Sequence, residues 1–138
     1  MRDFGKCEII IKNQRIPLRE NRSAITFINE KRLAIRKVEV DGCVITNGLR
    51  CDYLLIGNDD HEHYVELKGS KIKHALKQIT ATIDQISREK NKHPKSCYIS
   101  STRCPLTGTD IQKERLNFKK KFNARLLIKN GSYEIPIS

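Results

Sequence analysis

The chain has 138 residues and a formal net charge of +11; 38% of its residues are hydrophobic and 31% are charged. This length predicts a single domain over residues 1–138, and the composition excludes a disordered chain. No apolar run approaches the roughly 20 residues of a membrane-spanning helix, and the N-terminus lacks the apolar region of a secretory signal. We therefore expect a cytoplasmic protein.

The first third of the sequence predicts short strands. Residues 7–13 form a short strand, and residues 23–29 suit either a strand or a short helix. Residues 32–40 alternate between apolar and polar side chains, as a strand does. Asp41-Gly42 is a turn or bulge signal. Asn47-Gly48 tolerates the positive φ angles of a tight hairpin turn, which predicts an extended segment on either side of it.

Residues 49–56 and 63–68 are rich in Tyr, Val, Leu and Ile and predict two further strands. A five-residue loop, Gly57–His61, joins them, so that Ile56 pairs with Glu62. Together with residues 32–40, these segments predict an antiparallel meander.

After Gly69 the spacing of apolar residues changes from the alternation of a strand to the three- and four-residue spacing of a helix. A helix over residues 71–90 is expected, with Ser70 as its N-cap residue and one apolar face formed by Ile72, Leu76, Ile79, Ile83 and Ile86. A buried strand at residues 96–100 follows. A second helix begins with a capping box of Thr109 and Gln112 and runs to Phe122. Strands at 124–129 and near the C-terminus complete an α/β fold with a mixed β-sheet, an antiparallel meander followed by helix, strand, helix and strand.

Two acids stand where a central strand should carry apolar side chains. With the register above, Asp52 lies opposite Glu66, and their Cβ atoms are about 5 Å apart on one face of the sheet. Lys68 points to the same face. A divalent cation between the carboxylates would relieve their repulsion, and hard oxygen ligands favour Mg²⁺ or Mn²⁺. The alternative interpretation is a solvent-facing stripe in which Lys68 forms an ordinary ion pair.

The pattern of Asp52, thirteen intervening residues and Glu66-Leu67-Lys68, on two strands and before a helix, resembles the motif of the PD-(D/E)XK (restriction-endonuclease-like) nuclease superfamily. The resemblance covers residues 35–100. It implies a restriction-endonuclease-like core in which Asp52 and Glu66 bind the metal and Lys68 assists the attacking water. Gln78 matches a glutamine that family members often carry on the following helix, and Gln85 is the weaker candidate.

The sequence also departs from the family pattern. Residue 51 is Cys where the motif has Pro. The acidic helix that precedes the strands is not evident, although Glu20 or Glu30 could supply its acid.

The predicted function is therefore metal-dependent hydrolysis of phosphodiester bonds by an endonuclease acting on DNA. The alternatives are a non-catalytic, basic nucleic-acid-binding module on a nuclease-like fold and an interaction protein with an acidic partner. The net charge favours a nucleic acid over a membrane surface, because no long basic amphipathic helix with an aromatic face is present. Phosphate contacts are expected from Lys71, Lys73 and Lys77. A homodimer is compatible with double-strand cleavage.

The remaining reactive side chains are interpreted as structural. The five cysteines, an odd number without a CxxC pair, predict reduced thiols, and Cys43 and Cys51 are expected to be small core residues. His61 and His63 are expected to be exposed at the hairpin loop, with a metal-binding pair as the alternative. A phosphate contact by His74 is conceivable.

Overall fold

The computed structural model describes residues 3–20, 23–67, 71–87, 93–102 and 107–137. Nine strands, two α-helices and a short 3-10 helix, η1 (Gly5–Cys7), make up the described part. The strands are β1 (Glu8–Ile11), β2 (Arg15–Glu20), β3 (Ser23–Ile28), β4 (Ile35–Glu39), β5 (Tyr53–Ile56), β6 (Glu62–Glu66), β7 (Lys95–Ser101), β8 (Ala124–Asn130) and β9 (Tyr133–Pro136). The helices are α1 (Ile72–Ile86) and α2 (Gly108–Phe122).

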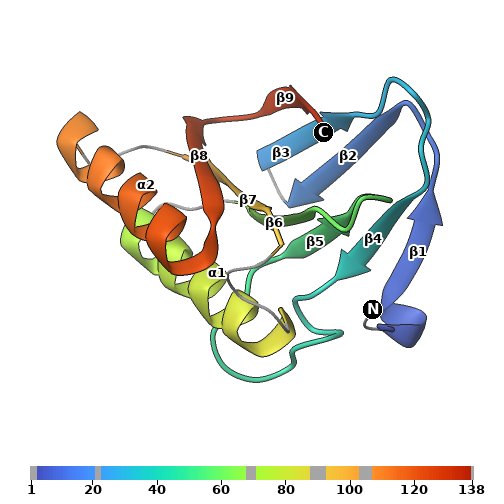
Figure 1. The fold of residues 1–138 in the computed structure, drawn as a ribbon, viewed down its shortest axis with the longest axis horizontal. Helices are drawn as coiled ribbons and strands as arrows, with labels where there is room; N and C mark the ends of the chain where they lie inside the picture. Colours follow the sequence, from blue (N-terminus) through green and yellow to red (C-terminus); the bar gives the residue numbers. More distant parts are fainter. Residues whose placement is uncertain (1–2, 21–22, 68–70, 88–92, 103–106, 138) are drawn as a thin grey trace.

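Six strands form one mixed sheet in the order β1-β4-β5-β6-β7-β8. Neighbours from β1 to β6 are antiparallel, and β6, β7 and β8 are parallel. Each parallel step needs a crossover, which α1 and α2 provide. Both crossovers advance across the sheet in the same direction, so both helices cover the same face (Figure 1).

The apolar face of α1 packs onto the sheet as predicted. Ile72, Leu76, Ile79, Ile83 and Ile86 are all buried. With Leu54 of β5, Tyr64 of β6, Cys97 of β7 and Phe122 of α2, they belong to a cluster that we call the helix-side core. The α/β class with a mixed sheet is thus confirmed.

A second sheet covers the opposite face of the six-stranded sheet. Its order is β2-β3-β9, with β9 parallel to β3 (Figure 1). The open choice for residues 23–29 is settled as a strand, and Pro17 lies in β2 at the edge of this sheet, where its missing N–H is tolerated. Phe27 of β3 and Tyr98 of β7 meet edge to face at 5.0 Å between ring centroids. These residues, with Leu55 and Val65, belong to the inter-sheet core.

Several local predictions were wrong. Asn47-Gly48 closes no hairpin, because residues 43–46 form turns and a single bridge instead of a strand. Helix α1 begins one residue late, with Lys71 at its N-cap and no side-chain cap; Ser70 lies outside the described residues. The capping box of α2 joins Thr107 to Asp110, two residues before the expected pair.

The prediction of reduced thiols was wrong for two of the cysteines. Cys7, at the end of η1, and Cys43, in the turn after β4, form a disulfide with a Cα–Cα distance of 5.8 Å. They are 36 residues apart, and only the pairing of β1 with β4 brings them together. Cys51 and Cys97 are free and buried; Cys104 lies outside the described residues.

No described helix is long and apolar enough to cross a membrane, and the cytoplasmic location stays a prediction.

Candidate functional site

The hairpin of β5 and β6 has the register that the sequence predicted. Ile56 pairs with Glu62, and Tyr53 pairs with Val65. The regular pairing ends there: Asp52 lies in a bend directly before β5, and its N–H donates to the Val65 carbonyl at 3.0 Å, one residue out of step with the ladder beside Glu66. Leu54 and Tyr64, two residues away on each strand, belong to the helix-side core. Since side chains alternate along a strand, the Glu66 carboxyl group faces the helices, and the Asp52 carboxyl group lies close enough to raise its pKa.

Backbone N–H groups hydrogen-bond to both the carbonyl and the side chain of Asp52. Its carbonyl accepts hydrogen bonds from the N–H groups of Val40 and Asp41, at 3.1 and 3.3 Å. Its carboxylate oxygen Oδ2 accepts from the N–H of Leu67 at 2.8 Å. The last of these bonds ties the Asp52 side chain to the chain segment that directly follows Glu66.

Glu66 is buried, with 6% of its surface exposed, and its Oε1 atom has no hydrogen-bond partner in the described part of the chain. A buried acceptor without a partner costs free energy. Burial is the main cause that raises the pKa of Glu66 to about 9, followed by the charge of Asp52 and a hydrogen bond between the two carboxyl groups.

Burial also raises the pKa of Asp52, to about 6. The Leu67 N–H opposes this rise, whereas the negative charges of Glu20 and Asp41 add to it. The neighbouring charges that raise the two pKa values are all negative. A cation bound between the two carboxyl groups would be attracted by these charges and would favour the ionised form of both acids.

Helix α1 holds the segment that leads into Asp52. Thr82 Oγ1 accepts a hydrogen bond from the Cys51 N–H at 2.8 Å and donates to the Gln78 carbonyl at 2.8 Å. The Gln78 side chain donates through Nε2 to the Arg50 carbonyl at 3.1 Å. Gln78 thus contacts the loop before β5, two residues ahead of Asp52. The sequence pattern did not single out Thr82, because its role depends on the contact of α1 with the segment before β5.

The three lysines expected to contact phosphate are exposed on α1 or at its start. Lys73 and Lys77 line a groove of about 630 Å³ between α1 and α2. Lys113 and Lys121 of α2 lie in the same groove, but so do three acids, Asp84, Asp110 and Glu114. Lys68 lies outside the described residues.

His61 and His63 lie on the face of the sheet that the small sheet covers, beside Phe27 and Tyr98. The prediction of an exposed loop residue was wrong for His63, which is fully buried in β6 with Nδ1 at 2.8 Å from the Tyr98 hydroxyl. His61 stacks on His63 at 4.3 Å between ring centroids and contacts Ser96 through Nε2 at 2.9 Å. His74 is exposed on α1.

Cys51 is buried as expected, and burial raises the pKa of its thiol to about 12, so it stays protonated.

The donor set of the candidate site fits a hard divalent cation. Two neighbouring carboxyl groups, one with an unpartnered buried oxygen, are the kind of ligand through which Mg²⁺ is usually bound, with water filling the other positions. Within the described residues, no group of three or more His, Cys, Asp or Glu side chains is placed to hold a metal. Of the two acids considered for a preceding helix, Glu20 ends β2 and influences Asp52, whereas Glu30 is exposed after β3.

Comparison of the chain with family models, with characterised proteins and with solved structures returned no match.

Proposed function

We propose that the protein is a metal-dependent endonuclease that hydrolyses phosphodiester bonds of DNA. The observation that carries the proposal is the pair of half-buried Asp52 and buried Glu66, two neighbouring carboxyl groups of which Glu66 has an Oε1 atom without a hydrogen-bond partner in the described part of the chain. A protein keeps such a costly arrangement where the charge has a use. The net charge of +11 suits a polyanionic substrate.

The order of elements supports a nuclease of the PD-(D/E)XK kind. Three antiparallel strands, β4, β5 and β6, are followed by a helix and a parallel strand, α1 and β7; Asp52 directly precedes β5, and Glu66 ends β6. This is the order that the resemblance implies. The described chain differs at its beginning, where η1 and β1 to β3 stand in place of the expected leading helix.

The chain's own groups would have distinct roles. Asp52 and Glu66 would hold Mg²⁺ or Mn²⁺, after Glu66 loses its proton. Such an ion, when bound, polarises a phosphate and lowers the pKa of a water ligand. Lys68 would stabilise the charge that develops on the phosphate or position the attacking water. Gln78 holds the loop before β5, so it would act as a positioning residue.

The test separates metal binding from cleavage. Plasmid and branched DNA are incubated with the protein and Mg²⁺ or Mn²⁺, and the melting temperature is measured with and without the ion. We expect Glu66→Gln and Asp52→Asn to lose both cleavage and stabilisation by the ion. Lys68→Ala should lose cleavage but keep the stabilisation. Glu62→Gln is the matched control, because Glu62 lies on the same strand but bonds to Tyr64 and Ser87.

Two results would contradict the proposal. If Glu66→Gln and Lys68→Ala cleave as well as the parent protein, the site is wrong. If the parent protein binds DNA tightly but neither binds the ion nor cleaves, the chain is a non-catalytic nucleic-acid-binding module.

A further inference from the structure

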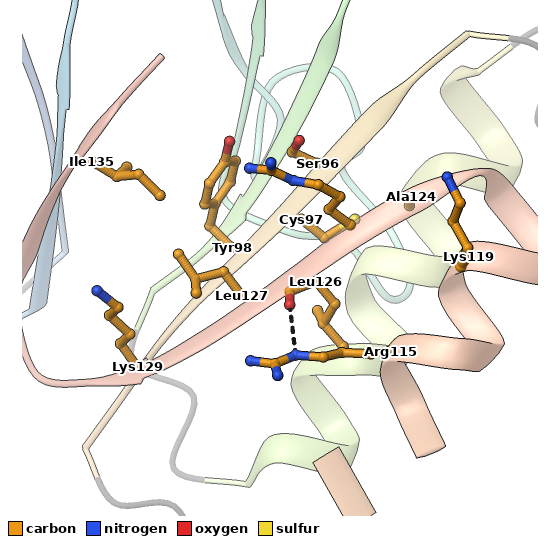
Figure 2. A pocket seen from close by; sticks show the side chains of 11 residues that line it. Ser96, Cys97, Tyr98, Arg115, Lys119, Ala124, Leu126, Leu127, Lys129 and Ile135 are labelled. Atoms are coloured by element: carbon orange, nitrogen blue, oxygen red, sulfur yellow. Dashed lines mark hydrogen bonds between the residues drawn. The ribbon is translucent and has the colours of Figure 1, made fainter. Parts of the chain in front are cut away.

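A second cavity lies over the edge strand β8, away from the acid pair. It encloses about 530 Å³, a volume within the range of small-molecule sites. Figure 2 shows that its side chains come from both sides of the strand, with Arg115 and Lys119 from α2 and with Tyr98 and Ile135 on the other side. We call it the β8-edge cavity.

The rim of the β8-edge cavity carries only positive charge. Two arginines and two lysines line it, and none of its eleven described lining residues is acidic. The four are Arg115, Lys119, Arg125 and Lys129. The groove between α1 and α2 differs, because three acids offset its lysines. The β8-edge cavity is therefore the better site for an anion.

Part of this rim is held in place. Arg115 donates through Nε to the Leu126 carbonyl at 3.1 Å, across the edge of β8 (Figure 2). Lys119 donates through Nζ to Asn123 at 3.0 Å, and the Lys129 ammonium lies 5.4 Å from the centre of the Tyr133 ring. Side chains fixed in this way lose less conformational entropy when a ligand binds.

The floor of the cavity is apolar. Leu127 of β8 pairs with Tyr98 of β7, so both side chains lie on the same face, and Ile135 of β9 stands opposite them (Figure 2). Leu127 and Ile135 are half-buried, which leaves apolar surface for a ligand. Arg125 and Lys129, two residues before and after Leu127 on β8, lie on the same face of the strand as this floor, whereas Arg115 and Lys119 come from α2 on the other side. Two cations beside an aliphatic floor suit a ligand with an anionic part and a flat apolar part.

We propose that the β8-edge cavity binds one unpaired nucleotide of a nucleic-acid strand. Arg125 and Lys129 contact its phosphate, and Leu127 and Ile135 contact its base. A paired base of a continuous duplex cannot enter a concave site, so the protein prefers DNA with a single-stranded tail or branch to blunt duplex. The choice of nucleic acid as ligand rests on the proposed function, whereas the charge and shape of the cavity do not.

The test measures binding without catalysis. The probes are a fluorescent 20-base-pair duplex and the same duplex with a three-nucleotide tail, with anisotropy read in EDTA at several salt concentrations. We expect the tailed duplex to bind at least fivefold more tightly. Arg125→Ser with Lys129→Ser should abolish this preference, weaken binding of the tailed duplex about tenfold and lower the salt slope by one to two.

The matched control removes two positive charges from the opposite edge of the sheet. Lys6→Ser with Lys12→Ser, both exposed beside β1, should keep the preference for the tail. Millimolar adenosine monophosphate should compete with the tail in the parent protein. Equal affinity of the parent for blunt and tailed duplex, or equal loss in both double variants, would overturn the inference.

The result of this binding test can be told apart from the result of the cleavage test. Since EDTA removes divalent ions, a protein that never cleaves can still show the preference, and an active nuclease can lack it.

Discussion

Asp52, directly before β5, and Glu66, at the end of β6, are neighbouring acids, and the charge of Asp52 raises the pKa of Glu66. Burial is the larger cause for both carboxyl groups and raises the pKa of Glu66 to about 9 and that of Asp52 to about 6. The metal-free site therefore keeps the Glu66 proton near neutral pH. A cation that binds here must displace that proton.

This pair makes the stability of the metal-free protein depend on pH. Folded Glu66 keeps its proton up to a pKa of about 9, while the unfolded chain releases it near the ordinary 4.5. Between these values the folded state binds more protons, so the free energy of unfolding falls as pH rises. The cost is absent below pH 4.5 and complete above pH 9. We expect Glu66→Gln to remove this decline, measured as melting temperature from pH 5 to 9 in EDTA.

The difference between parent and variant profiles isolates the pair from other titrating groups. Glu62→Gln is the control for removing an acid from the same strand, because it weakens the bonds that Glu62 accepts from Tyr64 and Ser87 and leaves Glu66 in place. Parallel profiles for the parent and Glu66→Gln would show that Glu66 does not hold a proton in the folded protein.

The Cys7–Cys43 disulfide should stabilise the fold. Closing a loop of 36 residues restricts the unfolded chain, which is worth about 2–4 kcal/mol. Cys7→Ser with Cys43→Ser should lower the free energy of unfolding by this amount in a guanidinium titration. A reductant should produce the same loss in the parent protein and none in the double variant. A parent protein that is insensitive to the reductant would contradict the prediction.

Thr82→Val tests the link between α1 and the segment that carries Asp52. The substitution keeps the side-chain volume but leaves the buried Cys51 N–H without its acceptor. An unsatisfied buried donor costs about 1–3 kcal/mol. Thr80→Val, two residues earlier at a half-buried position, should change the stability by less than about 0.5 kcal/mol. Urea unfolding of both variants measures the difference; equal effects would mean that the Cys51 bond contributes nothing.

Phe27→Ala tests whether the two sheets unfold together. The Phe27 ring is fully buried against Tyr98, and its removal from a packed core costs about 3–5 kcal/mol. We expect one cooperative transition, shifted to lower denaturant, seen by circular dichroism and by tyrosine fluorescence alike. Leu116→Ala, at a position that is 65% exposed, should leave the transition almost unchanged. Two separated transitions would mean that the small sheet unfolds by itself.

Local pattern was sufficient for much of the fold. The 3.6-residue period identified every buried isoleucine of α1, and alternation together with the loop length identified the register of β5 and β6. It failed at Asn47-Gly48, because a turn signal makes a hairpin only where both flanking segments find partners. It also failed at His63, since a residue near a loop in sequence is buried once a second sheet covers it.

The sequence by itself determined the register of β5 and β6, because a strand's period of two and a five-residue loop leave one register, and this register brings the segments of Asp52 and Glu66 side by side. Only the tertiary structure decided their chemistry. Glu66 is buried, Thr82 and Gln78 hold the approach to Asp52, and Glu20 adds its charge from a different sheet. The same holds for the disulfide and the β8-edge cavity. Burial, charge and pairing between distant segments depend on which surfaces meet, and no local pattern contains that information.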